Sequence, residues 1–124
     1  MTQKTSLRAS RYFSLVGVAA AINVVVFLIG QASGATYDVK APTPVILVMV
    51  IGMTVAQLAV GYLVAWLSAK YAPKFFGPLI WLGLVFAIVS APGGWILSQD
   101  AATGIALGLM HVSGGLAWFF GVKK

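Results

Sequence analysis

Residues 101–121, AATGIALGLMHVSGGLAWFFG, form the stretch of sequence that decides the fold. This stretch is apolar, is long enough to cross a bilayer as a helix, and contains the chain's only histidine, His111. Gly104, Gly108, His111 and Gly115 recur at intervals of four, three and four residues, so in an α-helix they share one face. The spacing predicts a helix-packing face of Gly104, Gly108 and Gly115 that lets another helix approach closely.

The composition of the whole chain indicates that its solvent is lipid. Of its 124 residues, 60% are hydrophobic and only 8% are charged. A soluble domain carries about 25% charged residues, and a chain this short could not bury so much apolar surface in water. We therefore expect an all-α, polytopic membrane protein, a bundle of four transmembrane helices that forms one domain over residues 1–124. The expected helices are residues 12–30, 45–67, 75–97 and 101–121.

Two short elements set the ends of the last two expected helices. Pro92-Gly93-Gly94 is expected to end or kink the third helix, because proline removes a helical hydrogen bond and glycine frees the backbone. Whether residues 95–97 complete that crossing is left open by the sequence. Asp100 is expected to cap the fourth helix, since its carboxylate can accept backbone N–H groups at the positive end of the helix dipole.

The distribution of charge predicts the orientation in the membrane. Seven of the eight basic residues fall on one side of the expected bundle, and Lys40 falls on the other with Asp38 and Asp100. The seven are Lys4, Arg8, Arg11, Lys70, Lys74, Lys123 and Lys124. Cytoplasmic loops are enriched in Lys and Arg, so both termini are expected in the cytoplasm, in a multi-pass protein of the cell (inner) membrane.

Aromatic residues gather on the same side and are expected to form an interfacial belt. They are Tyr12, Trp66, Tyr71, Phe75, Phe76, Trp81, Trp118, Phe119 and Phe120. The net charge of +6 is explained by these membrane-flanking positions, and no nucleic-acid partner is expected. A signal peptide cleaved near residues 32–35 is the alternative for the first apolar run, but that run is longer than a signal core and holds Asn23, so we expect it to be retained.

Three polar side chains lie near the centres of their expected helices: Asn23 in the first, Gln57 in the second and His111 in the fourth. One interpretation is a midplane polar site for a substrate or a proton, because ionisable groups inside a membrane are commonly functional. The other is that these groups hydrogen-bond one another and fix helix packing, with Asn23 or Gln57 satisfying the imidazole of His111. The sequence leaves both open.

The side-chain inventory limits the chemistry. The chain has no cysteine and no glutamate, and Asp38 and Asp100 are its only carboxylate side chains. No catalytic, cofactor-binding or metal-binding residues are predicted, and no cofactor is expected, because a lone histidine cannot build a metal cage or a two-histidine haem site. A serine hydrolase would need His111 as the base for Ser90, which we expect nearer the outer end of its helix than His111. We therefore expect a protein that is not an enzyme.

The segment from Ser90 to Gly121 resembles a family of small four-helix actinobacterial integral membrane proteins of unknown function. The matching features are Ala91-Pro92-Gly93-Gly94, Ala101-Ala102-Thr103, and Leu109-Met110-His111-Val112 followed by Gly114 and Gly115. The resemblance implies a four-helix membrane fold, and it implies no activity.

Three functions remain open at this point. The first is a non-enzymatic accessory or structural subunit, which packs against itself as a homo-oligomer or against a larger membrane complex. It is favoured because so few polar groups could line a solvated path through a chain of 124 residues. The second is a small transporter or channel subunit that uses Asn23, Gln57 and His111 at an oligomer interface. The third is a lipid-binding membrane protein, since a basic rim attracts anionic headgroups.

Overall fold

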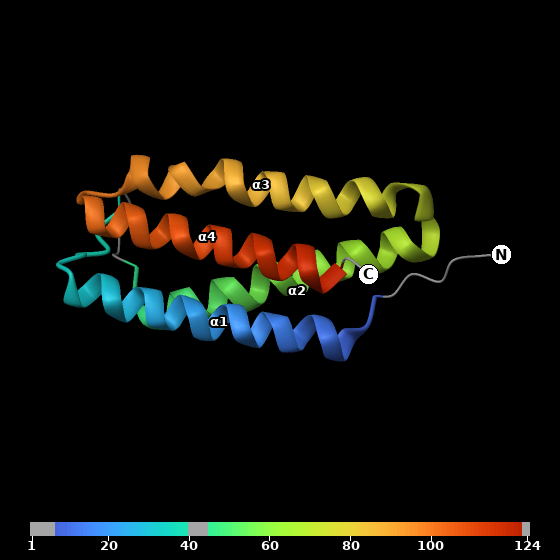
Figure 1. Cartoon of the computed structure of the whole chain (residues 1–124), viewed down its shortest axis with the longest axis horizontal. Helices are drawn as coiled ribbons and strands as arrows, with labels where there is room; N and C mark the ends of the chain where they lie inside the picture. The colour runs from blue at the N-terminus through green and yellow to red at the C-terminus, as the bar shows by residue number, and fades with distance from the viewer. Residues whose placement is uncertain (1–6, 40–44, 123–124) are drawn as a thin grey trace.

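The computed structural model describes residues 7–39 and 45–122, and within these ranges it contains four α-helices and no strand. Lys4, Lys40, Lys123 and Lys124, which contributed to the charge count above, lie outside the described residues. The elements are α1 (Ala9–Ala32), α2 (Leu47–Tyr71), the short 3-10 helix η1 (Pro73–Phe75), α3 (Phe76–Leu97) and α4 (Ala101–Val122) (Figure 1).

Four helices are long and apolar enough to cross a membrane, as the sequence predicts. Each contains 22 to 25 residues, which at about 1.5 Å per residue spans the roughly 30 Å hydrocarbon core. The expected boundaries differ by a few residues: α1 begins at Ala9 rather than Tyr12, and α2 continues to Tyr71 rather than Leu67. The extra residues carry α1 and α2 past their apolar runs into the basic flanks.

Pro92 lies inside α3, which continues through it to Leu97. Of the two outcomes expected for Pro92-Gly93-Gly94, an end to the helix is therefore not observed, and residues 95–97 belong to the same helix, in agreement with the expected range of residues 75–97. A proline removes one backbone donor, whereas ending the helix in an apolar medium would expose many unpaired backbone groups. A helix that continues through Pro92 therefore costs less free energy than one that ends there.

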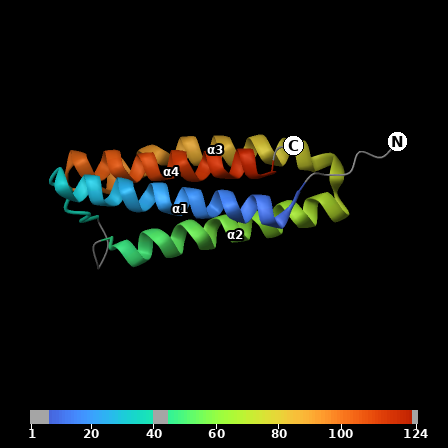
Figure 2. The same cartoon turned by 60° about the horizontal axis from the view of Figure 1, so that its bottom comes forward.

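Helices α1, α2 and α4 share the buried core, and α3 packs mainly on α4. The extensive interfaces are α3 with α4, α4 with α1, and α1 with α2, and α2 also contacts α4. Helices α2 and α3 have few contacts with each other, although η1 joins them directly. Both cartoon views show them meeting at this turn and separating toward the opposite end (Figures 1 and 2).

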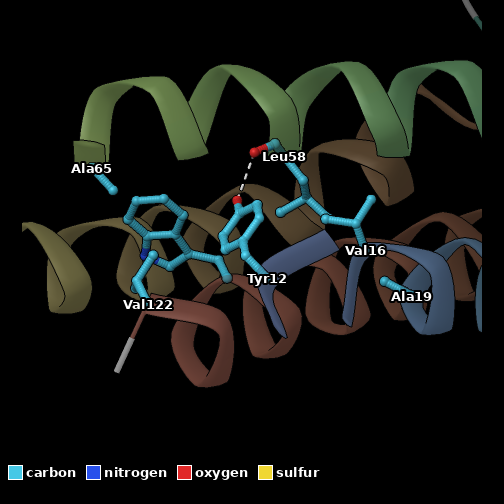
Figure 3. Packing of buried hydrophobic residues seen from close by; sticks show 7 residues of the cluster. Tyr12, Val16, Ala19, Leu58, Ala65 and Val122 are labelled. Carbon is cyan, nitrogen blue, oxygen red and sulfur yellow. Dashed lines mark hydrogen bonds between the residues drawn. The ribbon is translucent and has the colours of Figure 1, made fainter. Parts of the chain in front are cut away.

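The core at the basic end is built around two aromatic side chains that bond to helix carbonyls. The hydroxyl of Tyr12 on α1 donates to the carbonyl oxygen of Leu58 on α2 at 2.6 Å (Figure 3). Nε1 of Trp118 on α4 donates to the carbonyl oxygen of Ile80 on α3 at 2.9 Å. The two rings meet edge to face, with centroids 6.4 Å apart. This pair therefore connects all four helices.

Three aromatic residues assigned to the interfacial belt prove to be core residues. Tyr12, Trp118 and Phe119 are 1%, 7% and 7% exposed, so their placement in a belt is wrong. Hydropathy gives the depth of a residue along the helix, but the rotation of the helix decides whether it faces protein or lipid. Trp66, Tyr71, Phe75, Trp81 and Phe120 are exposed, in keeping with the expected belt.

A second cluster of buried residues fills the end of the bundle opposite η1. It consists of Phe27, Ala35, Tyr37, Val50, Ala106 and Met110, so residues of the loop after α1 pack between α1, α2 and α4. Tyr37 stacks on Phe27 with ring centroids 4.2 Å apart, and its hydroxyl donates to the carbonyl oxygen of Phe27 at 2.7 Å. This loop closes the bundle at the end opposite η1.

The glycine face of α4 lies toward α3. Gly104 and Gly115 are buried, and Gly108 is half-buried. A Cβ atom at Gly115 would lie 2.6 Å from the Cβ of Ala87, whereas one at Gly108 would lie 3.6 Å from the carbonyl oxygen of Ala91. The first position has no room for a methyl group, and the second does.

This difference predicts opposite effects of the same substitution. Gly115→Ala should lower the melting temperature in detergent, because the Cβ of Ala87 cannot rotate away and overpacking costs about 1–3 kcal/mol. Gly108→Ala is the matched control and should leave the melting temperature unchanged or slightly higher, because alanine favours a helix over glycine. Equal melting temperatures for the two variants would contradict this account of the α3–α4 interface.

Candidate functional site

Asn23 bonds across the α1–α2 interface. It is 3% exposed, and its Nδ2 donates to Oγ1 of Thr54 at 2.8 Å. The Thr54 hydroxyl in turn donates to the carbonyl oxygen of Val50 at 2.7 Å, so its own proton is directed into α2. The Oδ1 atom of Asn23 is buried and has no hydrogen-bond partner among the described residues. Asn23 thus provides an interhelical bond and one unused acceptor.

His111 bonds to its own helix. Its Nδ1 lies 2.8 Å from the carbonyl oxygen of Leu107, one turn earlier in α4. Because a carbonyl can only accept, Nδ1 must carry the proton, and in the neutral ring Nε2 is then left as an acceptor. The interpretation in which Asn23 or Gln57 satisfies Nδ1 is therefore replaced by a carbonyl that the helix itself holds within reach.

Gln57 is exposed on the surface of α2. It lies four residues before Gly61, whose Cβ position faces the ring of Trp118, and seven before Val64. This spacing places Gln57 on the flank of α2 that borders the open side toward α3. Thr54, three residues earlier, lies on the adjoining part of the same face, but the amide of Gln57 is exposed while Thr54 bonds to Asn23.

The open side between α2 and α3 also receives His111. Trp118, two turns further along the same face of α4, lies against both Gly61 and Gly83. Gly114 lies between His111 and Trp118 in α4. A Cβ at Gly114 would meet no atom within 4 Å, so no neighbouring helix lies close to α4 at this level. The three predicted midplane residues are therefore divided: Asn23 lies in the α1–α2 seam, and Gln57 and His111 border the open side.

Ser90 lies in α3 at nearly the depth of His111. The close approaches of Gly115 to Ala87 and of Gly108 to Ala91 show this register of α3 on α4. By the helix bounds, Ser90 is still closer to the outer end of its helix than His111 is, as expected. The Ser90 hydroxyl donates to the carbonyl oxygen of Ala87 at 3.0 Å, as a helical serine commonly does.

Asp100 organises the polar end opposite η1. Its Oδ2 accepts from the backbone N–H of Thr103 at 2.9 Å, which confirms the expected cap of α4. Its Oδ1 accepts from the hydroxyl groups of Thr36 at 2.6 Å and Thr103 at 2.9 Å. These bonds, led by that from the Thr36 hydroxyl, lower the pKa of Asp100 to about 2. The carboxylate therefore ties the loop after α1 to the start of α4.

Tyr37 anchors the same loop in an unusual backbone conformation. Its φ of 56° is left-handed, which side chains rarely adopt. Its backbone N–H donates to Oγ1 of Thr103 at 2.9 Å, and its ring is 1% exposed. Burial, with a smaller contribution from the negative charge of Asp100, raises the pKa of Tyr37. These contacts offset a strain of about 1–3 kcal/mol.

The Asp100 carboxylate predicts a pH dependence of stability. Because its pKa is lower in the folded state than its ordinary value of 3.8, the charged form stabilises the fold above that value. This contribution should be lost as the pH falls through about 2. The melting temperature in detergent should therefore decline over this window, and Asp100→Asn should lower it at neutral pH and flatten the decline. Asparagine caps a helix about as well as aspartate, so the variant removes mainly the charge.

Asp38→Asn is the matched control, because Asp38 lies in the same loop and is exposed. It should keep the decline of the unmodified protein. A decline that is unchanged in Asp100→Asn would contradict the assignment to Asp100.

Comparison with known proteins places the whole chain in one family. A family model described as a family of unknown function, DUF6069, matches residues 2–124, which extends the similarity well beyond the last third of the chain. No curated protein and no solved structure matches. With four apolar helices, the chain has the features of a small multi-pass membrane protein. It belongs to DUF6069, a family of unknown function.

Proposed function

We propose that this chain is a non-enzymatic accessory or structural subunit of the cytoplasmic membrane, which packs against itself or against a larger membrane complex. The observation that carries the proposal is that polar side chains within the spans form hydrogen bonds between helices. Tyr12, Asn23 and Trp118 each donate a hydrogen bond to a neighbouring helix. Groups used in this way build a packing unit, and each helix-to-helix bond inside a membrane contributes about 0.6 kcal/mol on average.

The proposed orientation has both termini in the cytoplasm. Arg8, Arg11, Lys70 and Lys74 lie where α1 begins and where α2 passes into α3, and Asp38 and Asp100 lie at the opposite end. Arg11 also donates to the carbonyl oxygen of Phe120 at 2.6 Å, which joins the start of α1 to the end of α4. The excess of basic residues supports a cytoplasmic location for this end. We also propose an actinobacterial origin, which rests on the resemblance noted above for the segment from Ser90 to Gly121.

Single cysteines test the orientation, because the chain has none of its own. Asp38→Cys should react with a membrane-impermeant maleimide in intact cells, and Ser10→Cys should react only after the membrane is permeabilised. Both positions are exposed, so access through the membrane is the main difference between them. The reverse labelling pattern would overturn the proposed orientation.

The subunit role is tested by purification of the tagged protein from native membranes in mild detergent, followed by the native mass of the particle. We expect a larger partner at fixed stoichiometry or a homo-oligomer of defined size. A monomer that has no protein partner and the full stability of the membrane-bound form would overturn the proposal. Gly115→Ala, which changes only an internal interface, is a control for nonspecific loss of the complex.

A transporter or channel subunit is the second candidate. It is favoured by the unused Oδ1 acceptor of buried Asn23 and by the location of His111 beside the open α2–α3 side. Among the described residues, the hydrogen bond of His111 is to its own helix, so His111→Ala should leave the melting temperature nearly unchanged. In a homo-oligomer, a flux that His111→Ala abolishes would establish this second function, and the absence of a flux in the unmodified protein would eliminate it.

A further inference from the structure

A groove of about 350 Å³ lies between α2 and α3 near the turn that joins them. Its lining consists of Val64, Ser68, Phe75, Pro78, Leu79 and Leu82. Ser68 is the one hydroxyl in this lining, and its Oγ donates to the carbonyl oxygen of Ala72 at 3.3 Å. The groove therefore presents a hydrocarbon surface to whatever occupies it.

The ring of Trp118 keeps this side of the bundle open. A Cβ at either Gly61 on α2 or Gly83 on α3 would clash with that ring, so the indole already fills the closest approach of the two helices. Val64 and Leu82 lie within one turn of these glycines, toward the η1 end. Because α2 and α3 cannot close over the indole, the space beside it stays accessible from the side.

Two lysines lie beside aromatic rings near the η1 end, and one of them, Lys74, lies beside a residue of the groove lining. Nζ of Lys70 lies 4.9 Å from the ring centroid of Trp66 and 5.2 Å from that of Tyr71. Nζ of Lys74 lies 5.1 Å from the ring centroid of Phe75, which itself lines the groove. Lysine beside exposed aromatic rings is typical of the boundary between hydrocarbon and headgroups.

No carboxylate side chain neutralises the positive charge at this end of the described residues. The acidic side chains, Asp38 and Asp100, lie at the opposite end of the helices. The described basic side chains near the η1 end are Arg8, Arg11, Lys70 and Lys74, and Arg11 is bonded to the carbonyl oxygen of Phe120. Lys74, next to the lining residue Phe75, is thus complementary to an anion at the membrane surface beside the groove, whereas Lys70 lies over Trp66 on another face of α2.

We propose that this groove binds an anionic phospholipid, with an acyl chain between α2 and α3 and the phosphate beside Lys74. The charge beside the groove favours a lipid over a partner helix, because Lys74 can bind a phosphate at the membrane surface while the apolar lining contacts the acyl chain. The proposal rests on the membrane location proposed above, but it does not depend on which end faces the cytoplasm.

Native mass spectrometry of the purified full chain in detergent tests the proposal, with phosphatidylglycerol and phosphatidylcholine of identical acyl chains as probes. The protein should retain phosphatidylglycerol in preference to phosphatidylcholine. Lys74→Gln should weaken phosphatidylglycerol binding about fivefold, the effect expected for one basic residue near an anionic headgroup, whereas Lys70→Gln, on another face of α2, should not. Arg8→Gln removes the same charge at the same end of the bundle but away from the groove, so it should leave binding unchanged.

A second pair of variants tests the acyl chain. Leu82 lines the groove and is 64% exposed, so Leu82→Trp should fill the groove without disturbing the core, and it should weaken binding of both lipids. Val85→Trp, one turn further along the exposed surface of α3 and outside the lining, is the matched control and should bind as the unmodified protein does. The melting temperature of each variant shows that it is folded.

Three results would overturn the proposal: equal retention of the two lipids, an equal loss in Arg8→Gln, or full binding by Leu82→Trp. The second result would indicate general electrostatic attraction, and the third would remove the acyl chain from the groove. Because the assay uses isolated protein in detergent, none of these results bears on the orientation or on the subunit partners proposed above.

Discussion

The position of Trp118 controls the arrangement of the other helices. Its indole lies against Gly61 and Gly83, so a ring from α4 fills the space where α2 and α3 would otherwise meet. Its Nε1 bond to the carbonyl oxygen of Ile80 satisfies the only donor of the indole in a medium without water. The indole and the two glycines that make room for it therefore set the spacing of α2 and α3 at this level.

The helix arrangement also explains why the polar residues of the spans do not gather in one site. In a regular four-helix bundle, inward-facing groups at the same depth meet on the central axis. Here Asn23 on α1 reaches Thr54 on α2, while His111 lies on the face of α4 that also carries Trp118. The indole of Trp118 and the separation of α2 from α3 keep these groups apart.

Properties that depend on one helix at a time could be predicted from the sequence, and properties that depend on two helices could not. Local composition and spacing indicate the four apolar runs, the cap at Asp100 and the small residues that face another helix. The partner of Asn23, the burial of Tyr12 and the groove beside Val64 depend on how each helix is rotated about its axis. The near absence of a polar face on α3 leaves that rotation without a signal in the sequence, since lipid and protein interior are almost equally apolar.

The exposure of Gln57 gives information about what surrounds this side of α2. An amide moved from water into hydrocarbon without a partner costs about 4–8 kcal/mol, far more than a typical interhelical hydrogen bond returns. A glutamine exposed midway along α2 is therefore an expensive residue to keep if only acyl chains surround it. Because Gln57 borders the same open side as His111, its cost is offset if that side is occupied by something polar at this depth, such as a second helix or water. The apolar groove near η1 and this more polar level are thus two different surfaces on one side of the protein.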